Sequence, residues 1–85
     1  MPFRILWVDD QIDELRAHFV FLTEKGYAVE GAANGRDALA MLEHGPYDAI
    51  LLDEMMPGLG ALETLAEIKK VDETVPVIMV TKSEA

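Results

Sequence analysis

Hydrophobic and polar residues follow one another along the chain in short blocks that predict alternating strands and helices. Three runs, residues 3–8, 48–53 and 76–80, are almost continuously apolar. Such runs are typical of strands buried on both faces of a parallel sheet. A fourth strand is predicted at residues 27–32, and its mixed pattern places it nearer to an edge of the sheet.

Between these strands, apolar residues recur at helical spacing and predict three helices, at residues 11–25, 36–43 and 61–70. Gly26 lies just past the first helix, where glycine commonly ends a helix. Asn34 precedes the second helix and can cap it. In the third helix, the residues expected to face the core are Leu62, Leu65 and Ile68.

The order strand-helix-strand-helix-strand-helix-strand predicts one fold class. Strands that alternate with helices pair in parallel through right-handed crossovers, so we expect a three-layer α/β fold. With 85 residues, the chain is long enough for one small domain, and its hydrophobic share of 51% suits a packed core.

The charge balance excludes some functions and favours others. The chain has 16 acidic and 7 basic residues, for a net charge of -9, which argues against nucleic-acid binding by this segment. The excess of acid suits a divalent cation or a basic partner, and it also suits a simple solvated surface. Cysteine is absent, so thiol chemistry is excluded. No apolar run approaches the length of a membrane span and no signal peptide is visible, so we expect a cytoplasmic protein without membrane contact.

Polar side chains that could bind a ligand or react follow three of the strands. Asp9 and Asp10 follow the first strand, Asp53 ends the third, and Thr81 follows the last. In a parallel sheet these ends share one rim, where ligands of open α/β sheets bind. The turn at residues 57–58 leads us to expect Asp53 half-exposed on that rim.

Three converging carboxylates repel one another unless a cation binds between them. Mg²⁺ prefers oxygen ligands and fits such a site. One carboxylate could then act as a nucleophile toward a phosphoryl group, and the Thr81 hydroxyl could hydrogen-bond a phosphoryl oxygen. Simpler roles stay open: Asp10 as a helix cap, Asp53 as a turn residue, and Thr81 as an ordinary residue at a strand end.

Three sequence signatures appear in order on these strands: ILWVDD, then LLDEMMPG, then PVIMVT. Together they resemble the receiver domain of bacterial two-component response regulators. The resemblance implies a flavodoxin-like fold with strand order 2-1-3-4-5. The family's fifth strand and last helices have no counterpart in this sequence. We therefore expect the order 2-1-3-4, with residues 1–85 forming the N-terminal portion of a single receiver domain.

The resemblance also implies a role for each candidate residue. Asp53 is the implied phosphoacceptor, which takes a phosphoryl group from a sensor histidine kinase and thereby switches an output or dimer surface. Asp10 is the implied direct Mg²⁺ ligand, Asp9 acts largely through water, and the backbone carbonyl of Met55 is a further ligand. Thr81 is the implied switch hydroxyl. By this resemblance the domain is a switch that assists its own phosphorylation and dephosphorylation, and it is not a turnover enzyme.

Two features depart from the family pattern. The lysine that contacts the phosphoryl group in the family lies on the fifth strand, and Lys82 stands where a small residue usually follows the switch threonine. We expect Lys82 to modulate the phosphorylated state. The set LWVDD, LLDEMMPG and VTKSEA resembles a narrower group of regulators, in which the receiver is joined to a C-terminal domain of the alkaline-phosphatase superfamily.

Other functions stay open at this point. A Mg²⁺-dependent phosphohydrolase could use the same aspartyl-phosphate chemistry, but it commonly needs a second acid close after the nucleophile, and the candidate here is Glu54. A pseudo-receiver that binds partners without being phosphorylated is the other alternative. The strand at 76–80 has no charge to protect it if it forms an edge. We therefore expect one of three outcomes: residues 1–85 are the ordered part of a longer chain, two copies form a homodimer or a swapped dimer, or the isolated segment is partly molten.

Overall fold

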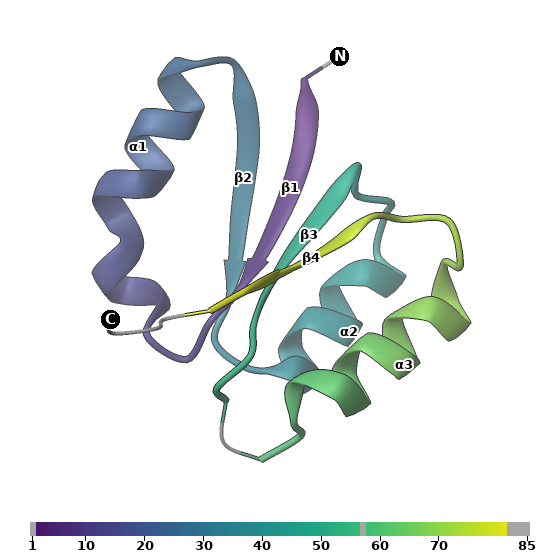
Figure 1. Ribbon diagram of the computed structural model, residues 1–85. Coiled ribbons are helices and arrows are strands. Elements are labelled where there is room, and N and C mark those ends of the chain that lie inside the picture. The colour runs from purple at the N-terminus through teal and green to yellow at the C-terminus, as the bar shows by residue number, and fades with distance from the viewer. Residues whose placement is uncertain (1, 57, 82–85) are drawn as a thin grey trace.

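The computed structural model describes residues 2–56 and 58–81, which form a parallel sheet with helices on both faces (Figure 1). The elements in chain order are β1 (Phe3–Val8), a 3₁₀ turn η1 (Ile12–Leu15), α1 (Arg16–Glu24), β2 (Tyr27–Ala32), α2 (Gly35–Glu43), β3 (Ala49–Asp53), α3 (Ala61–Val71) and β4 (Val77–Val80). The predicted alternation of strands and helices is confirmed.

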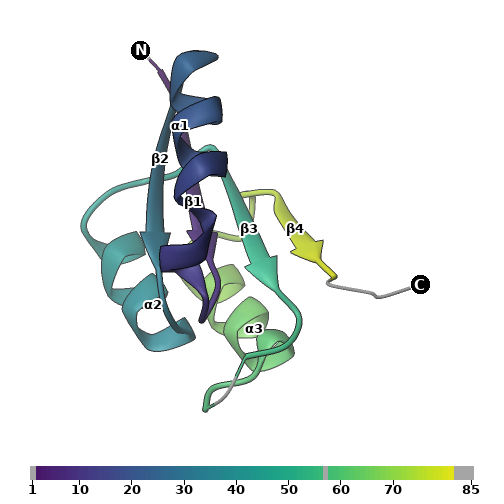
Figure 2. The same cartoon turned by 90° about the vertical axis from the view of Figure 1, so that its left-hand side faces the viewer.

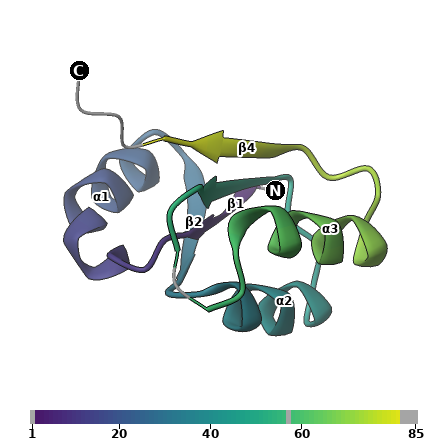
Figure 3. The same cartoon turned by 60° about the horizontal axis from the view of Figure 1, so that its bottom comes forward.

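The four strands are ordered β2-β1-β3-β4, and each neighbouring pair is parallel. This order and the edge position of β2 are as predicted. Figures 2 and 3 show α1 on one face of the sheet and α2 with α3 on the other. The described residues therefore form three layers, with the carboxyl ends of all strands at one edge.

The two faces of the sheet are covered unequally. On the face of α2 and α3, Leu6, Ile50 and Leu52 are fully buried. On the opposite face, Leu51 is only half-buried and Ile78 is 54% exposed. Among the described residues, α1 is the one helix on that face, and it packs over β1 and β2. The prediction that every apolar run is buried on both faces is therefore wrong for β4 and only partly met by β3 and by β1, whose Phe3 is 47% exposed.

The first predicted helix is divided into two pieces. Residues 11–25 were expected as one helix, but a 3₁₀ turn precedes α1, which begins at Arg16. The Asp9 carbonyl accepts from the Ile12 N–H at 3.1 Å, and the Asp9 side chain accepts from the Gln11 N–H at 2.9 Å. These local bonds keep the start of the segment in tight turns, because a short polar side chain competes with regular helix for backbone groups.

Most other boundaries differ from the prediction by a residue at one end, as is usual for helix and strand ends. The caps agree with the prediction. The Asn34 side chain accepts from the Asp37 N–H at 2.8 Å and so caps α2. Gly26 has a φ of 97°, a left-handed conformation that glycine adopts without strain, and the chain leaves α1 there.

The inward face of α3 is predicted correctly for Ile68, which is fully buried, and for Leu65, which packs against the core, but not for Leu62. Leu62 was expected in the core but is 75% exposed, whereas Ala61, Thr64 and Ile68 are buried. Successive residues of a helix are rotated by about 100°, so a helix that buries Ala61 turns the next side chain away from the sheet. Alanine and threonine signal an inward position weakly, which is why the apolar periodicity selected the wrong leucine.

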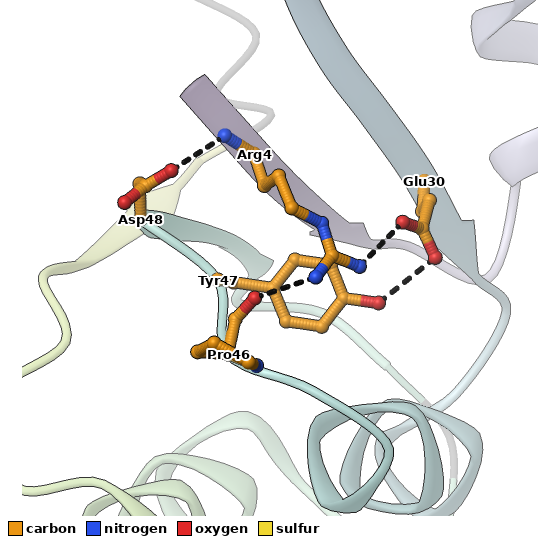
Figure 4. Close-up of polar contacts among 5 residues, drawn as sticks. All are labelled: Arg4, Glu30, Pro46, Tyr47 and Asp48. Atoms are coloured by element: carbon orange, nitrogen blue, oxygen red, sulfur yellow. Dashed lines mark hydrogen bonds and ion pairs between the residues drawn. The ribbon is translucent and has the colours of Figure 1, made fainter. Parts of the chain in front are cut away.

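A polar network closes the amino end of the sheet (Figure 4). The Arg4 guanidinium contacts a Glu30 carboxylate oxygen at 2.8 Å and donates to the Pro46 carbonyl at 2.9 Å. Its central carbon lies 4.6 Å from the centre of the Tyr47 ring, and the Tyr47 hydroxyl donates to Glu30 at 2.9 Å. The Arg4 N–H donates to the Asp48 carboxylate at 2.7 Å. The network thus ties β1, β2 and the segment that enters β3.

Within this network, Arg4, Glu30 and Tyr47 shift one another's pKa. The hydrogen bond from Arg4 lowers the pKa of the Glu30 carboxyl group, and the bond from Tyr47 adds to this effect. The same bond to Glu30 raises the pKa of Arg4. Burial, followed by the hydrogen bond to Glu30, raises the pKa of the Tyr47 hydroxyl. The network therefore stabilises charged arginine and charged glutamate together.

Candidate functional site: an acidic cluster at the carboxyl edge

The register of the sheet brings the candidate residues to one edge. Val8 of β1 pairs with Leu52 of β3, so the residues that follow these two, Asp9 and Asp53, are neighbours. Asp53 in turn pairs with Val80 of β4, and Thr81 is the next residue along the chain. The strands thus deliver the acids and the threonine to one edge because all four end there in parallel.

Three carboxylates converge at this edge. One oxygen from each of Asp9, Asp10 and Asp53 lies within 4.8 Å of the others. Asp9 and Asp53 are fully buried, whereas Asp10 is exposed. The structure therefore brings together the three acids selected from the sequence, with one of them open to solvent.

The burial of Asp53 corrects the expectation that it would be half-exposed. Beyond Asp53, the Glu54 N–H still donates to the Val80 carbonyl at 3.1 Å. The β3–β4 pairing therefore continues past Asp53, which is itself paired with Val80. Gly58, which has a φ of 76°, lies five residues after Asp53, and the turn expected there does not lift Asp53 out of the sheet.

Backbone hydrogen bonds orient both buried carboxylates in the same way. The Gln11 N–H donates to Asp9 Oδ1 at 2.9 Å, and the Met55 N–H donates to Asp53 Oδ1 at 3.1 Å. Each acid thus accepts from the backbone two residues further on, which is a turn that aspartate commonly forms. Gln11 is a contributor that the sequence reading did not select. The sequence feature that could have identified Gln11 is its position, two residues after an aspartate at the end of a strand.

The donor set fits a magnesium ion. Burying two carboxylates beside a third is costly unless a cation or a proton neutralises them. Mg²⁺ takes oxygen ligands, commonly one or two carboxylates together with waters. The exposed Asp10 leaves one side of the cluster open for these waters. The Met55 backbone is attached to the same site through its bond to Asp53. The cluster is therefore chemically suited to a hard divalent cation.

The structure relates the remaining candidate residues less directly to the cluster of three acids. Thr81 is exposed at the same edge. Lys82 lies outside the described residues. Glu54 is exposed and lines a hollow with Gly60, Leu62 and Met79, away from the three clustered acids.

Comparison with known proteins identifies the family. The profile described as "Response regulator receiver domain" matches residues 5–85. The chain therefore belongs to the receiver-domain family of response regulators, as its signatures suggested. None of the helices within residues 2–56 and 58–81 is long and apolar enough to cross a membrane.

The chain resembles full-length regulators over one part of their length. It is 45% identical over 78 residues to "Transcriptional regulatory protein CpxR homolog" of Haemophilus influenzae, covering 92% of this chain and 34% of that protein. The chain spans about a third of the length of the curated relatives it matches. The narrower resemblance to regulators with an alkaline-phosphatase-superfamily domain stays a prediction.

Solved receiver structures share the fold closely. The response regulator TrrA of Thermotoga maritima in complex with Mg(2+)-BeF superposes with a TM-score of 0.86 at 37% identity, covering 99% of this chain and 72% of that one. TrrA in complex with the histidine kinase ThkA gives a TM-score of 0.86 at 36% identity, covering 100% and 72%. The neighbours thus confirm a flavodoxin-like receiver fold.

Proposed function

We propose that this domain is the phosphoacceptor switch of a two-component phosphorelay, with Asp53 as the phosphoacceptor. The observation that carries the proposal is the buried Asp53 carboxylate, held by the Met55 N–H within 4.8 Å of Asp9 and Asp10. A carboxylate oxygen of Asp53 attacks phosphorus, the bond from phosphorus to the histidine nitrogen of the kinase breaks, and an aspartyl phosphate forms.

We infer a Mg²⁺ site at the same place, with Asp10 and Asp53 as direct ligands, Asp9 acting through water and the Met55 carbonyl as a further ligand. When bound, the ion offsets the charge on the phosphoryl oxygens. The protein supplies the geometry: two carboxylates are oriented by backbone N–H groups, and Asp10 faces solvent. The Mg(2+)-BeF complex of TrrA supports this assignment.

Thr81 is proposed as the switch hydroxyl, because it follows β4 directly beside the strand that carries Asp53. Its O–H would donate to a phosphoryl oxygen and draw the chain after β4 toward the site. Lys82 is proposed as a modulator of the phosphorylated state. Movement of this segment would change an output or dimer surface.

A sensor histidine kinase is the proposed partner. The complex of TrrA with the histidine kinase ThkA, with 36% identity between TrrA and this chain, supports that class of partner. The 85 residues would then be the N-terminal portion of a single receiver domain, and the activity of the whole protein would depend on what that domain is joined to.

A phosphohydrolase is less well supported than a switch. Such an enzyme would need a second acid near the nucleophile, and Glu54 is exposed on another side of the β3–α3 segment. A pseudo-receiver would lack phosphorylation altogether. Incubation with acetyl phosphate and Mg²⁺, followed by intact-mass measurement, distinguishes the three classes.

The switch predicts a mass gain of one phosphoryl group that requires Mg²⁺ and decays slowly. Repeated release of inorganic phosphate from small phosphate esters would indicate a phosphohydrolase. No mass gain under any condition would indicate a pseudo-receiver. Asp13→Asn is a matched control, because it removes an exposed acid outside the cluster.

Self-association of an isolated polypeptide of residues 1–85 is a further part of the proposal. Within the described residues β4 is an edge strand, and its Ile78 side chain is 54% exposed. A bare apolar edge favours pairing with a second copy. On this polypeptide, sedimentation equilibrium should show a paired or swapped dimer, or thermal unfolding should show a partly molten piece of a longer chain. A dilute monomer with a sharp cooperative transition would contradict this expectation.

A further inference from the structure

The helices α2 and α3 lie side by side on one face of the sheet (Figure 3) and approach each other closely at Gly35. A Cβ atom placed on Gly35 would lie 2.3 Å from the Thr64 hydroxyl oxygen and 3.2 Å from Cδ2 of Leu59. The first distance is far below van der Waals contact, so any side chain at this position must displace its neighbours. Glycine is needed at position 35 because a side chain has no room there. Its backbone is helical, so the backbone conformation does not require glycine.

Thr64 has little freedom to move away from this contact. It is fully buried, and among the described residues the buried polar or charged side chains are Thr64, Asp9 and Asp53. Its backbone N–H donates to the Gly60 carbonyl at 2.8 Å. Its hydroxyl is 3.5 Å from the Leu59 carbonyl, to which it donates. The first turn of α3 is therefore attached to the segment that precedes it.

That segment is the chain between Asp53 and α3, which also carries Met55. At its start, the Met55 N–H is bonded to the Asp53 carboxylate, and Met56 packs against the core. At its end, Leu59 lies against Gly35 and Thr64. Leu59 follows Met55 by four positions in the sequence, and both Met56 and Leu59 pack against other parts of the domain. The packing of Leu59 therefore bears on where the Met55 backbone lies.

We propose that Gly35 and Thr64 are positioning residues for the acidic site. The missing side chain at position 35 provides the space in which Thr64 and Leu59 are held, and this packing sets where the Met55 backbone lies beside Asp53. The inference rests on the proposed Mg²⁺ site and names two residues that contact neither the ion nor the clustered acids. Groups that hydrogen-bond a metal ligand commonly affect metal affinity about tenfold or more. The Met55 N–H is such a group for Asp53, and Gly35 and Thr64 would act through its position.

The test is a double-mutant cycle across the contact between Gly35 and Thr64, in which Mg²⁺ affinity is measured by calorimetry. Gly35→Ala should weaken Mg²⁺ binding roughly tenfold, because the new methyl group displaces Thr64 and Leu59. Thr64→Ala should also weaken binding, because it leaves Leu59 unsupported. The double variant should recover most of the affinity, since removing the threonine hydroxyl leaves the nearest remaining Thr64 atom, Cβ, 3.3 Å from the added Cβ.

Stability and site loss need separate controls. Ala40→Gly changes an exposed position of α2 and lowers helix stability without entering the contact, so it should leave Mg²⁺ affinity unchanged. Asp10→Asn tests the metal site itself: retained Mg²⁺ affinity in that variant would refute the proposed function. Unchanged affinity in Gly35→Ala, or in Thr64→Ala where Gly35→Ala does not fold, would overturn the positioning role alone. Failure of the double variant to recover affinity would overturn it as well.

Discussion

Neutralising Asp53 should stabilise the metal-free protein. Asp9 and Asp53 are both fully buried, and their oxygens lie within 4.8 Å of each other. At an effective dielectric constant of about 20, two like charges 4.8 Å apart repel by about 3.5 kcal/mol. Asp53→Asn removes this repulsion with almost no change in volume, and the amide oxygen can still accept from the Met55 N–H. Solvent screening and a weaker hydrogen bond reduce the gain, so we expect about 1–3 kcal/mol.

Magnesium should remove most or all of this difference in stability. At the proposed site the ion would bind only the folded state, so a concentration about a hundredfold above its dissociation constant should add about 2.7 kcal/mol to the wild type. Asp53→Asn would lack one of the proposed carboxylate ligands and should gain little. Urea unfolding in EDTA and in MgCl₂, followed through the fluorescence of Trp7, measures all four free energies. Trp7 is suited to this because it stacks on Phe19 with ring centres 5.7 Å apart.

Asp13→Asn is the control, because it removes one negative charge from an exposed position outside the cluster. Its stability in EDTA should stay within about 0.5 kcal/mol of the wild type, as is usual for surface changes. If Asp53→Asn were no more stable than the wild type without metal, or if Asp13→Asn gained as much, local repulsion at the site would not be the cause.

Three further predictions address other parts of the chain. Ile68→Ala should lower the unfolding free energy by about 2–5 kcal/mol, because Ile68 is fully buried. Leu62→Ala should change it by less than about 0.5 kcal/mol, because Leu62 is 75% exposed, and denaturant unfolding measures both changes. The bond from Arg4 lowers the pKa of Glu30, so its stabilisation is present above the ordinary pKa of about 4.3 and is lost as the pH falls through the lowered value. The stability difference between wild type and Glu30→Gln should therefore shrink on acidification, and a difference that grew would contradict this. Lys82→Ala should shorten the half-life of the aspartyl phosphate, because a smaller neutral residue admits water, and a longer half-life would count against that role.

The strand order and the gathering of acids at one edge could be predicted because they depend on strong signals. Continuous apolar runs mark buried strands, and parallel pairing then brings Asp9, Asp10 and Asp53 to the same edge. The cap at Asn34 and the glycine after α1 were also predictable, since each is a local effect of one residue type.

The burial of Asp53, the division of the first helix and the inward face of α3 could not be predicted in this way. Asp53 is buried because pairing with β4 continues past it, which no local pattern records. The face of α3 is set by packing against α2, where a small residue at Gly35 admits Thr64. For Asp53 and for α3, a contact between distant segments overrides the local preference. The first helix is instead divided by the local hydrogen bonds that Asp9 accepts, which apolar periodicity does not record.

Mapping the phosphorylated residue tests the central claim most directly. The protein is treated with acetyl phosphate and Mg²⁺, the acyl phosphate is reduced with borohydride, and the modified peptide is identified by mass spectrometry. The account predicts one modified residue, Asp53, and loss of the adduct without Mg²⁺ or in Asp53→Ala. An adduct on Asp9 or Asp10 that persists in Asp53→Ala would contradict it.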